Sequence, residues 1–345
     1  MPPTPVRLAE ANKKPGLVYA FTNEGVELPF IDVTHPEFEV KLTEEEISAR
    51  NAAHLAQERN RARAPLIVRR FLFRIYARKS VILTGMIQAS KSFLSGMNTY
   101  ILKLGAANLG SYAGKIDRFV AASFPALIIR LRTQNTARLL ASGIERPLSE
   151  SPGAPLHLLN IAGGPAADSL NGLIVTRKQN PGLLEGREIV IHVLDLEKAA
   201  PDFGRRTLES LRAPGGALNG LDVAFVHIAY DWSQPEGLRA ALLSLGDRKC
   251  VAALSTEGGL FEYGSDADIL SNLEVVRDAG PPGTFIVGSV TRDDEQNRLL
   301  HGPNLIPVKR RGLAVFGALV QRAGWAVETA IERPFSDVVR LVKIQ

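Results

Sequence analysis

Three stretches of the sequence place chemically useful residues directly after apolar runs that are typical of strands. The first, LLNIAGGPAADSL over residues 158–170, passes from an apolar run through Asn160 into Gly163 and Gly164, and a helical pattern follows. Glycine lets the backbone approach a ligand closely, and a helix start offers free N–H groups and a positive dipole end. This turn can cradle a nucleotide-like cofactor, although an ordinary strand-to-helix connection has the same composition.

Acidic residues end the next two apolar runs. Asp195 ends the run HVLD, and Asp231 follows the run FVHIAY with Trp232 directly after it. An ionised carboxylate only accepts hydrogen bonds, so Asp195 can take both hydroxyls of a ribose and Asp231 can accept from the exocyclic amine of adenine. Trp232 can stack on the base. Taken one at a time, each residue also has an ordinary structural role: Asp195 as a helix cap or loop acid, Asp231 as the N-cap of the next helix, and Trp232 as a packing side chain. Together, the three strand ends carry what an adenosine ligand needs.

A fourth apolar run ends in STEGGLFEYGSD, over residues 255–266. Ser255 belongs to the predicted cofactor-binding set. Glu257 is the first candidate for a catalytic, substrate-facing group and Tyr263 is the second, because this segment should lie beside the reacting end of a ligand. In the alternative interpretation, Ser265 and Asp266 cap the next helix and the nearby acids are simply solvated.

Histidine and cysteine carry less information. His35, in IDVTHPEF, is the third catalytic candidate because its loop could fold over the cofactor pocket, the alternative being a structural histidine before Pro36. His192 and His227 lie inside predicted strands and suit core or face positions. No spacing resembles a metal site, so no metal is expected. The single cysteine, Cys250, excludes an intrachain disulfide framework and a Cys-rich zinc site.

Strand and helix patterns alternate after residue 150. Five apolar runs are each followed by a helical pattern: LHLLNIA, EIVIHVLDL, LDVAFVHIAY, CVAALS and TFIVGSV. Two final runs, WAVETAIE and DVVRLVKIQ, are joined only by RPFS, and so short a connection joins antiparallel strands. The pattern predicts an α/β fold with a seven-stranded, doubly wound, Rossmann-like sheet whose last strand is antiparallel.

The first 149 residues have a different character. Residues 1–16 are rich in Pro and Lys and are expected to form a flexible tail. Residues 17–149 are mainly helical after a short hairpin across TNEG, and the first long helix begins at the N-cap Thr43 and ends before Pro65. The Pro-, Gly- and Ser-containing segment RPLSESPGAP marks the boundary to a ligand-binding domain over 150–345.

The bulk composition narrows the class of protein. The 345 residues are 45% apolar and 22% charged, with a net charge of +5 that permits an anionic partner without demanding one. The N-terminus lacks the apolar core of a signal peptide, and no apolar run is long enough for a membrane span, so a soluble cytoplasmic protein is expected. Nucleic acid is not an expected partner, because aromatic residues make up 6% and no recognition motif or dense basic tract is present.

Residues 150–345 resemble the class I S-adenosylmethionine-dependent methyltransferases, including the reversed last strand. The family's first motif, DxGxGxG, matches Asn160, Ala162, Gly164 and Ala166, so one glycine is kept and the acid is an amide. Asp195 matches the ribose-binding acid and Asp231 the acid that contacts adenine. The resemblance implies S-adenosyl-L-methionine as cofactor. The expected cofactor-binding set is Asn160, Ala162, Gly163, Gly164, Pro165, Asp195, Leu196, Asp231, Trp232 and Ser255.

The function that follows is methylation of a small organic acceptor on O, N or C, for example in secondary metabolism. Two alternatives stay open because the first motif is altered: a non-methylating cyclisation or rearrangement, and a binding role without catalysis. In similar methyltransferases an N-terminal helical part caps the acceptor pocket or builds a dimer, which makes a homodimer an expectation from resemblance.

Arginines spaced by four form a basic stripe in this N-terminal part, at Arg70, Arg74 and Arg78. The stripe suits a solvated helix face, an acidic substrate or partner, or weak contact with anionic lipid, without stable membrane insertion.

Overall fold

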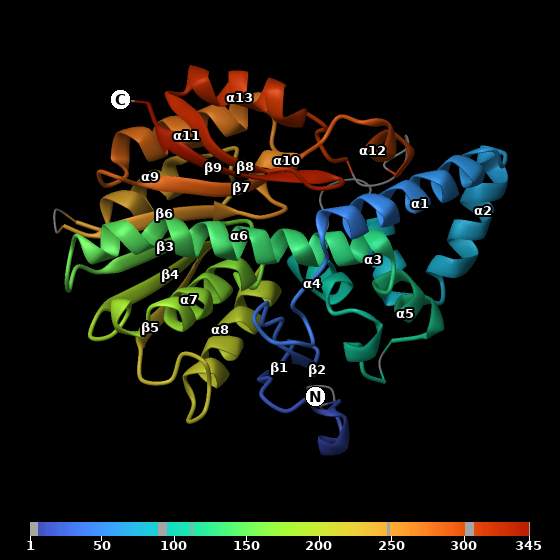
Figure 1. The fold of residues 1–345 in the computed structure, drawn as a ribbon, viewed down its shortest axis with the longest axis horizontal. Helices are drawn as coiled ribbons and strands as arrows, with labels where there is room; N and C mark the ends of the chain where they lie inside the picture. The colour runs from blue at the N-terminus through green and yellow to red at the C-terminus, as the bar shows by residue number, and fades with distance from the viewer. Residues whose placement is uncertain (1–5, 89–94, 112, 247–248, 301–306, 345) are drawn as a thin grey trace.

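The computed structural model describes residues 6–88, 95–111, 113–246, 249–300 and 307–344. Its largest feature is a seven-stranded sheet (Figure 1). The strands are β3 (Leu156–Ile161), β4 (Glu188–Leu194), β5 (Asp222–Ile228), β6 (Val251–Thr256), β7 (Phe285–Thr291), β8 (Trp325–Ile331) and β9 (Ser336–Lys343). Across the sheet they follow the order β5-β4-β3-β6-β7-β9-β8.

Strand direction confirms the predicted sheet. The pairs that β3, β4, β5, β6 and β7 form with one another are all parallel. Strand β9, in contrast, pairs antiparallel with both β7 and β8. Strands β4 and β5 are added on one side of β3, and the strands from β6 onward are added on the other side. The strand order therefore reverses between β3 and β6. Ligands of such sheets bind outside the carboxyl ends of the strands at this reversal.

Helices cover both faces of the sheet. On one face lie α6 (Phe124–Ser149), α7 (Ala167–Gln179) and α8 (Ala199–Arg212), and on the other lie α9 (Glu236–Leu243), α11 (Asp266–Ala279) and α13 (Gly312–Arg322). Two short helices, α10 (Leu260–Tyr263) and α12 (Glu295–Leu300), follow β6 and β7. Each crossover helix buries one apolar stripe against the strands, which is why the strands read as unbroken apolar runs.

The N-terminal region is mainly helical, as predicted. It contains β1 (Tyr19–Phe21) and β2 (Glu27–Pro29), then α1 (Glu44–Ala62), α2 (Leu66–Ala77), α3 (Val81–Gln88), α4 (Gly96–Lys103) and α5 (Lys115–Ala121). Short 3-10 turns, η1 (Glu10–Asn12), η3 (Ala106–Asn108) and η4 (Pro181–Leu183), connect neighbouring elements. Thr43 caps α1 in a capping box with Glu46, as its sequence position indicates. Of the predicted tail, residues 1–5 lie outside the described residues, and Lys13 pairs with Glu27 of β2.

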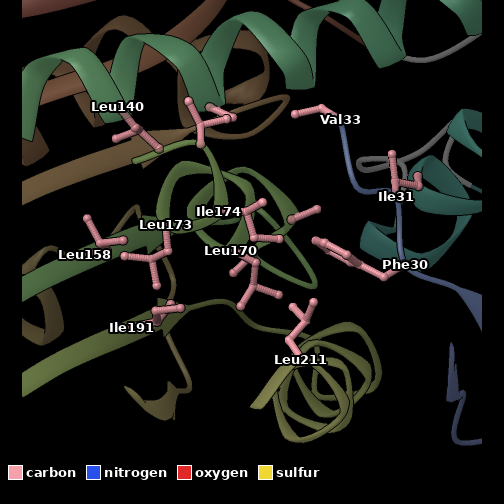
Figure 2. Close-up of a cluster of buried hydrophobic side chains, with 14 of the residues drawn as sticks. Phe30, Ile31, Val33, Leu140, Leu158, Leu170, Leu173, Ile174, Ile191 and Leu211 are labelled. Atoms are coloured by element: carbon pink, nitrogen blue, oxygen red, sulfur yellow. The ribbon is translucent and has the colours of Figure 1, made fainter. Parts of the chain in front are cut away.

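The N-terminal segment shares a core with the sheet. Figure 2 shows Phe30 beside Leu170 and Ile174 of α7, with Ile31 and Val33 further along the same N-terminal segment. Asn171 of α7 ties this segment down, because its amide donates to the Ile31 carbonyl at 2.8 Å and accepts from the Val33 N–H at 2.9 Å. The expected boundary near residue 150 therefore marks the change from helices to alternating strands, while α6 packs directly against the sheet.

Candidate functional site

A small cleft that opens to solvent lies at the carboxyl ends of the parallel strands. It is lined by Gly96, Ala162, Asp195, Leu196, Glu197, Tyr230, Trp232, Gly258, Gly259 and Tyr263. Five of these residues belong to the sequence-predicted site: Ala162, Asp195, Leu196, Trp232 and Tyr263. The loops after β3, β4, β5 and β6 thus meet where the reversal in strand order places a ligand site.

The turn after β3 keeps a left-handed backbone at alternate positions. Ala162 has φ +53°, Gly164 has φ +60° and Ala166 has φ +52°. A left-handed conformation costs an L-residue about 1–2 kcal/mol, so alanine is strained at the two outer positions. The methyltransferase motif that this turn resembles has glycine at all three positions. Here the backbone keeps the left-handed geometry although alanine replaces glycine at 162 and 166.

Gly164 is also the point where the N-terminal helices reach the turn. A Cβ atom added at Gly96, the first residue of α4, would lie 2.7 Å from the Gly164 Cα. Two glycines therefore allow the start of α4 to close over the turn. Nothing in the sequence around Gly96 points to this contact, because its partner lies 68 positions further along the chain.

Asp195 directly follows β4 and lies in the cavity wall. Its Oδ2 accepts from the Gly164 N–H at 3.1 Å, and its Oδ1 accepts from the Glu197 N–H at 2.9 Å. Burial raises the pKa of Asp195, and the two backbone N–H donors oppose that rise. Each carboxylate oxygen accepts one protein hydrogen bond and keeps a lone pair for a hydroxyl of a ligand.

Trp232 and Asp231 both follow β5, but only Trp232 lines the cavity. The indole lines the cavity, and its backbone carbonyl accepts from the Asn272 side chain at 2.7 Å. Asp231 instead turns to Ser233, accepting from its N–H at 2.9 Å and from its hydroxyl at 2.8 Å. Asp231 was expected to contact adenine, but its Oδ1 closes the turn before α9 and the residue does not line the cavity. Tyr230, which sequence reasoning missed, lines the cavity in its place.

Behind the turn, Asn160 forms a buried polar cluster with an acid that the sequence did not single out. Its Nδ2 donates to Asp168 Oδ1 at 2.7 Å and to the Ser255 hydroxyl at 3.0 Å. Burial raises the pKa of Asp168 to about 6, with Glu257 contributing in the same direction. Asn160 Oδ1 and Asp168 Oδ2 are both buried and find no donor among the described residues. Because buried acceptors are usually paired, these two oxygens are candidates for accepting from a water or a ligand.

Several other predicted residues support the site from behind. Gly163 covers Asn160, whose Oδ1 lies 2.2 Å from the position that a Cβ at Gly163 would take. The Pro165 carbonyl packs against Gly204 of α8 in the same way. Ser255 belongs to the cluster around Asn160. These residues shape the turn without forming part of the cavity wall.

Glu257 does not have the substrate-facing position that the sequence analysis expected. It is buried, and it forms ion pairs with Lys103 of α4 and Arg132 of α6. Thr133 donates to Glu257 Oε2 at 3.2 Å, and Arg132 also pairs with Glu262 at 2.8 Å. We call Lys103, Arg132, Glu257 and Glu262 the buried ion cluster. It joins the N-terminal helices to the loop after β6.

Electrostatics explains why Glu257 is a poor proton acceptor. Burial alone would raise the pKa of Glu257, but the Lys103 ammonium and the Arg132 guanidinium outweigh it and lower the pKa to about 2. A carboxylate with so low a pKa stays ionised at neutral pH and takes up a proton reluctantly. The sequence reasoning failed here because both cations lie more than 120 positions away along the chain.

Tyr263 and His35, the other catalytic candidates, have different locations. Tyr263, the last residue of α10, lines the cavity. The His35 Nε2 lies 3.0 Å from the Pro15 carbonyl, and its Nδ1 accepts from the Glu37 N–H at 3.2 Å. His35 therefore orders the loop before α1, and it is not one of the residues that line the cavity. This is the structural role that the sequence analysis gave as the alternative.

Neither a metal site nor a membrane-spanning helix is expected from the sequence. Within it, no cluster of His, Cys, Asp and Glu has the arrangement of a metal site. No helix there is both long and apolar enough to cross a bilayer.

Comparisons with known proteins concern the fold. No protein-family model matches the sequence, and a comparison with curated proteins finds no match. A solved structure described as a possible exported protein from Bordetella parapertussis has 17% identity and a TM-score of 0.55, over 88% of this chain and all of that one. Lower similarity is found to an O-methyltransferase family protein from Burkholderia thailandensis (14% identity, TM-score 0.42, 67% and 61% of the two chains). The mitomycin 7-O-methyltransferase MmcR is similar at 13% identity (TM-score 0.39, 72% and 66% of the two chains). The similarity to the Bordetella parapertussis protein, at 17% identity, establishes the fold alone.

Proposed function

We propose that the protein binds S-adenosylmethionine in the cavity and methylates a small organic acceptor. One observation carries the proposal: Asp195, Trp232 and the left-handed turn at Ala162 line one cavity at the carboxyl ends of the strands. A diol-binding carboxylate, an aromatic ring and a close backbone turn are the groups that an adenosine ligand needs. The same three features were expected from separate parts of the sequence.

The residues present fit each end of this cofactor. Asp195 would bind the ribose hydroxyls through its free lone pairs, and Trp232 would stack on the adenine with Leu196 beside it. The methionyl end carries an ammonium group, which only donates hydrogen bonds. Asn160 Oδ1 and Asp168 Oδ2 are buried acceptors without donors directly behind the turn, and we propose that they accept from that group. Asp168 then supplies, eight positions later, the negative charge that Asn160 lacks.

The remaining wall of the cavity would face the acceptor. Gly258 and Gly259 bring backbone close to the cavity, Gly96 covers it from α4, and Tyr263 contributes a hydroxyl. When bound, the cofactor supplies an electrophilic methyl group on a sulfonium. The protein's own task is to hold the acceptor atom in line and to exclude water, and such positioning provides much of the rate acceleration. Because Glu257 is held in ion pairs, we propose that the acceptor is methylated without proton removal by that residue.

A thermal-shift titration with S-adenosylhomocysteine tests the binding site. We expect the melting temperature to rise with ligand concentration for the wild type, because a ligand that binds only the folded state stabilises it. Asp195→Ala should abolish the rise, whereas the matched control Asp231→Ala should keep it, since Asp231 bonds to Ser233 outside the cavity. An unchanged response of Asp195→Ala would refute the assignment of the ribose-binding residue.

Transfer of a labelled methyl group to a panel of phenols, amines and carboxylic acids tests the chemistry. The proposal predicts label in at least one acceptor, and Tyr263→Phe should alter the acceptor preference. Cofactor binding with no transfer to any acceptor would instead favour the non-methylating reaction or the binding role that the altered turn sequence leaves open.

A further inference from the structure

Helix α2 exposes most of its apolar residues. The exposed fraction is 82% for Ile67, 64% for Phe71 and 39% for Ile75. A second row is similarly exposed, with Val68 at 45%, Leu72 at 44% and Tyr76 at 50%. In Figure 1, α2 lies at the end of the N-terminal helices that is farthest from the sheet. A soluble domain seldom leaves so large a contiguous apolar surface uncovered unless something binds there.

These six residues form one continuous surface. Ile67, Phe71 and Ile75 are spaced by four, and Val68, Leu72 and Tyr76 repeat the same spacing one position later. At 100° per residue the two rows together cover about 180° of the helix circumference. We call them the α2 apolar face. Ala77, which is buried, lies on the opposite side of the helix, where α3 packs.

Cations border the α2 apolar face on both sides. Helical geometry places Arg69 next to the second row and Arg74 next to the first, and Arg74 is exposed. Arg78 and Lys79 follow directly after the helix and are also exposed. Among the described residues, no carboxylate forms an ion pair with Arg74, Arg78 or Lys79. The bordering charges are therefore available to an external partner.

The sequence around this face contains no acidic residue. Between Glu58 and Asp117 the chain has eleven Lys and Arg residues and no Asp or Glu. This region alone therefore carries a charge of +11, and the rest of the chain must carry −6 to give the net charge of +5. Such a distribution attracts an anionic surface over several ångströms, and the attraction is screened by salt.

We propose that the α2 apolar face binds the surface of an anionic lipid bilayer. An apolar half-cylinder with arginine at both margins is the arrangement of a helix lying in the bilayer interface, where the arginine side chains reach back to the headgroups. A second copy of the chain fits less well. A two-fold interface sets the same surface against itself, and here that would bring arginine against arginine with no acid to offset the repulsion.

Vesicle sedimentation tests this inference independently of any enzymatic activity. The full-length protein is mixed with vesicles of phosphatidylcholine alone or with 30% phosphatidylserine. We expect at least tenfold stronger binding to the phosphatidylserine vesicles, and a loss of most of that binding in 0.5 M NaCl. Equal binding to both vesicles, or no binding to either at low salt, would overturn the inference.

Matched variants locate the contact. Phe71→Ser combined with Ile75→Ser should weaken vesicle binding at least tenfold, because each removes an apolar side chain from the interface. The control pair Leu243→Ser and Val315→Ser removes residues of comparable exposure, 64% and 60%, from the far helices α9 and α13 and should leave binding unchanged. Equal loss in both pairs would contradict the assignment to α2.

Analytical ultracentrifugation separates a bilayer from a second copy. If the α2 apolar face is a subunit interface, the wild type sediments as a dimer, the Phe71→Ser and Ile75→Ser variant sediments as a monomer, and neither binds vesicles. That result would overturn the inference. All variants change exposed side chains, so unchanged circular dichroism and melting temperature are the expected signs of an intact fold.

Discussion

Replacing Glu257 by Gln tests the buried ion cluster most sharply. In the folded protein Glu257 has a pKa of about 2 against an ordinary value of 4.5, held there by Lys103 and Arg132 despite its burial. That difference corresponds to about 3 kcal/mol in favour of the ionised folded state. Breaking a buried ion pair from one side costs about 3–5 kcal/mol, because the partner charges remain buried and uncompensated. Both routes predict that Glu257→Gln lowers the unfolding free energy by about 3 kcal/mol at pH 7.

The pH dependence gives the prediction a second, independent readout. Because the folded pKa of Glu257 lies below the unfolded value, its contribution is complete above pH 4.5 and is lost as the pH falls toward 2. The stability difference between wild type and Glu257→Gln should therefore shrink over that interval. Urea denaturation followed by circular dichroism measures it.

The control for this experiment is Glu274→Gln, an acid of α11 outside the buried ion cluster. It should change the unfolding free energy by less than about 0.5 kcal/mol, as surface substitutions usually do. A Glu257→Gln variant as stable as this control would refute the ion-pair reasoning. A stable variant that had lost catalysis would restore the original expectation of a catalytic Glu257.

Three further predictions concern the turn, the strands and the cofactor. Ala162→Gly should raise the unfolding free energy by up to about 1 kcal/mol in urea denaturation, and Ala162→Val should lower it, because a β-branched residue fits φ +53° poorly; equal stability of the two variants would contradict the strain. Burial lowers the pKa of His192 to about 4 from its usual 6.5, so the protein should lose about 3 kcal/mol between pH 6.5 and 4, and a His192→Gln variant should lack that loss. Asp168→Asn should weaken S-adenosylmethionine binding about tenfold at pH 8, and wild-type binding should weaken below pH 6 as Asp168 is protonated; pH-independent affinity in the wild type would exclude Asp168 from the ammonium site.

Local patterns explain how much of the fold was predictable. The five apolar runs followed by helical patterns indicate parallel strands, and the four-residue connection RPFS forces β8 and β9 to be antiparallel. Asp195 and Trp232 were predictable for the same reason, because a residue at the end of a parallel strand must lie at the ligand-binding edge. No long-range information is needed for either inference.

The remainder of the site depends on contacts that no local pattern contains. Glu257 was expected to face a substrate because it follows a strand end, but Lys103 and Arg132 approach it from the N-terminal helices. Asp231 lies outside the cavity lining for a local reason, since Ser233 two positions later offers both a hydroxyl and an N–H to its Oδ1. Gly96 carries no signal at all, because its role depends on the close approach of Gly164.

Isothermal titration calorimetry with S-adenosylmethionine tests the central claim most directly. The proposed site predicts saturable binding of one molecule per chain to the wild type, with S-adenosylhomocysteine competing for the same site. It also predicts that Asp195→Ala removes the binding heat and that Asp231→Ala retains it. If neither compound binds the correctly folded wild-type protein at millimolar concentration, the cavity is not an S-adenosylmethionine site and the proposed function is wrong.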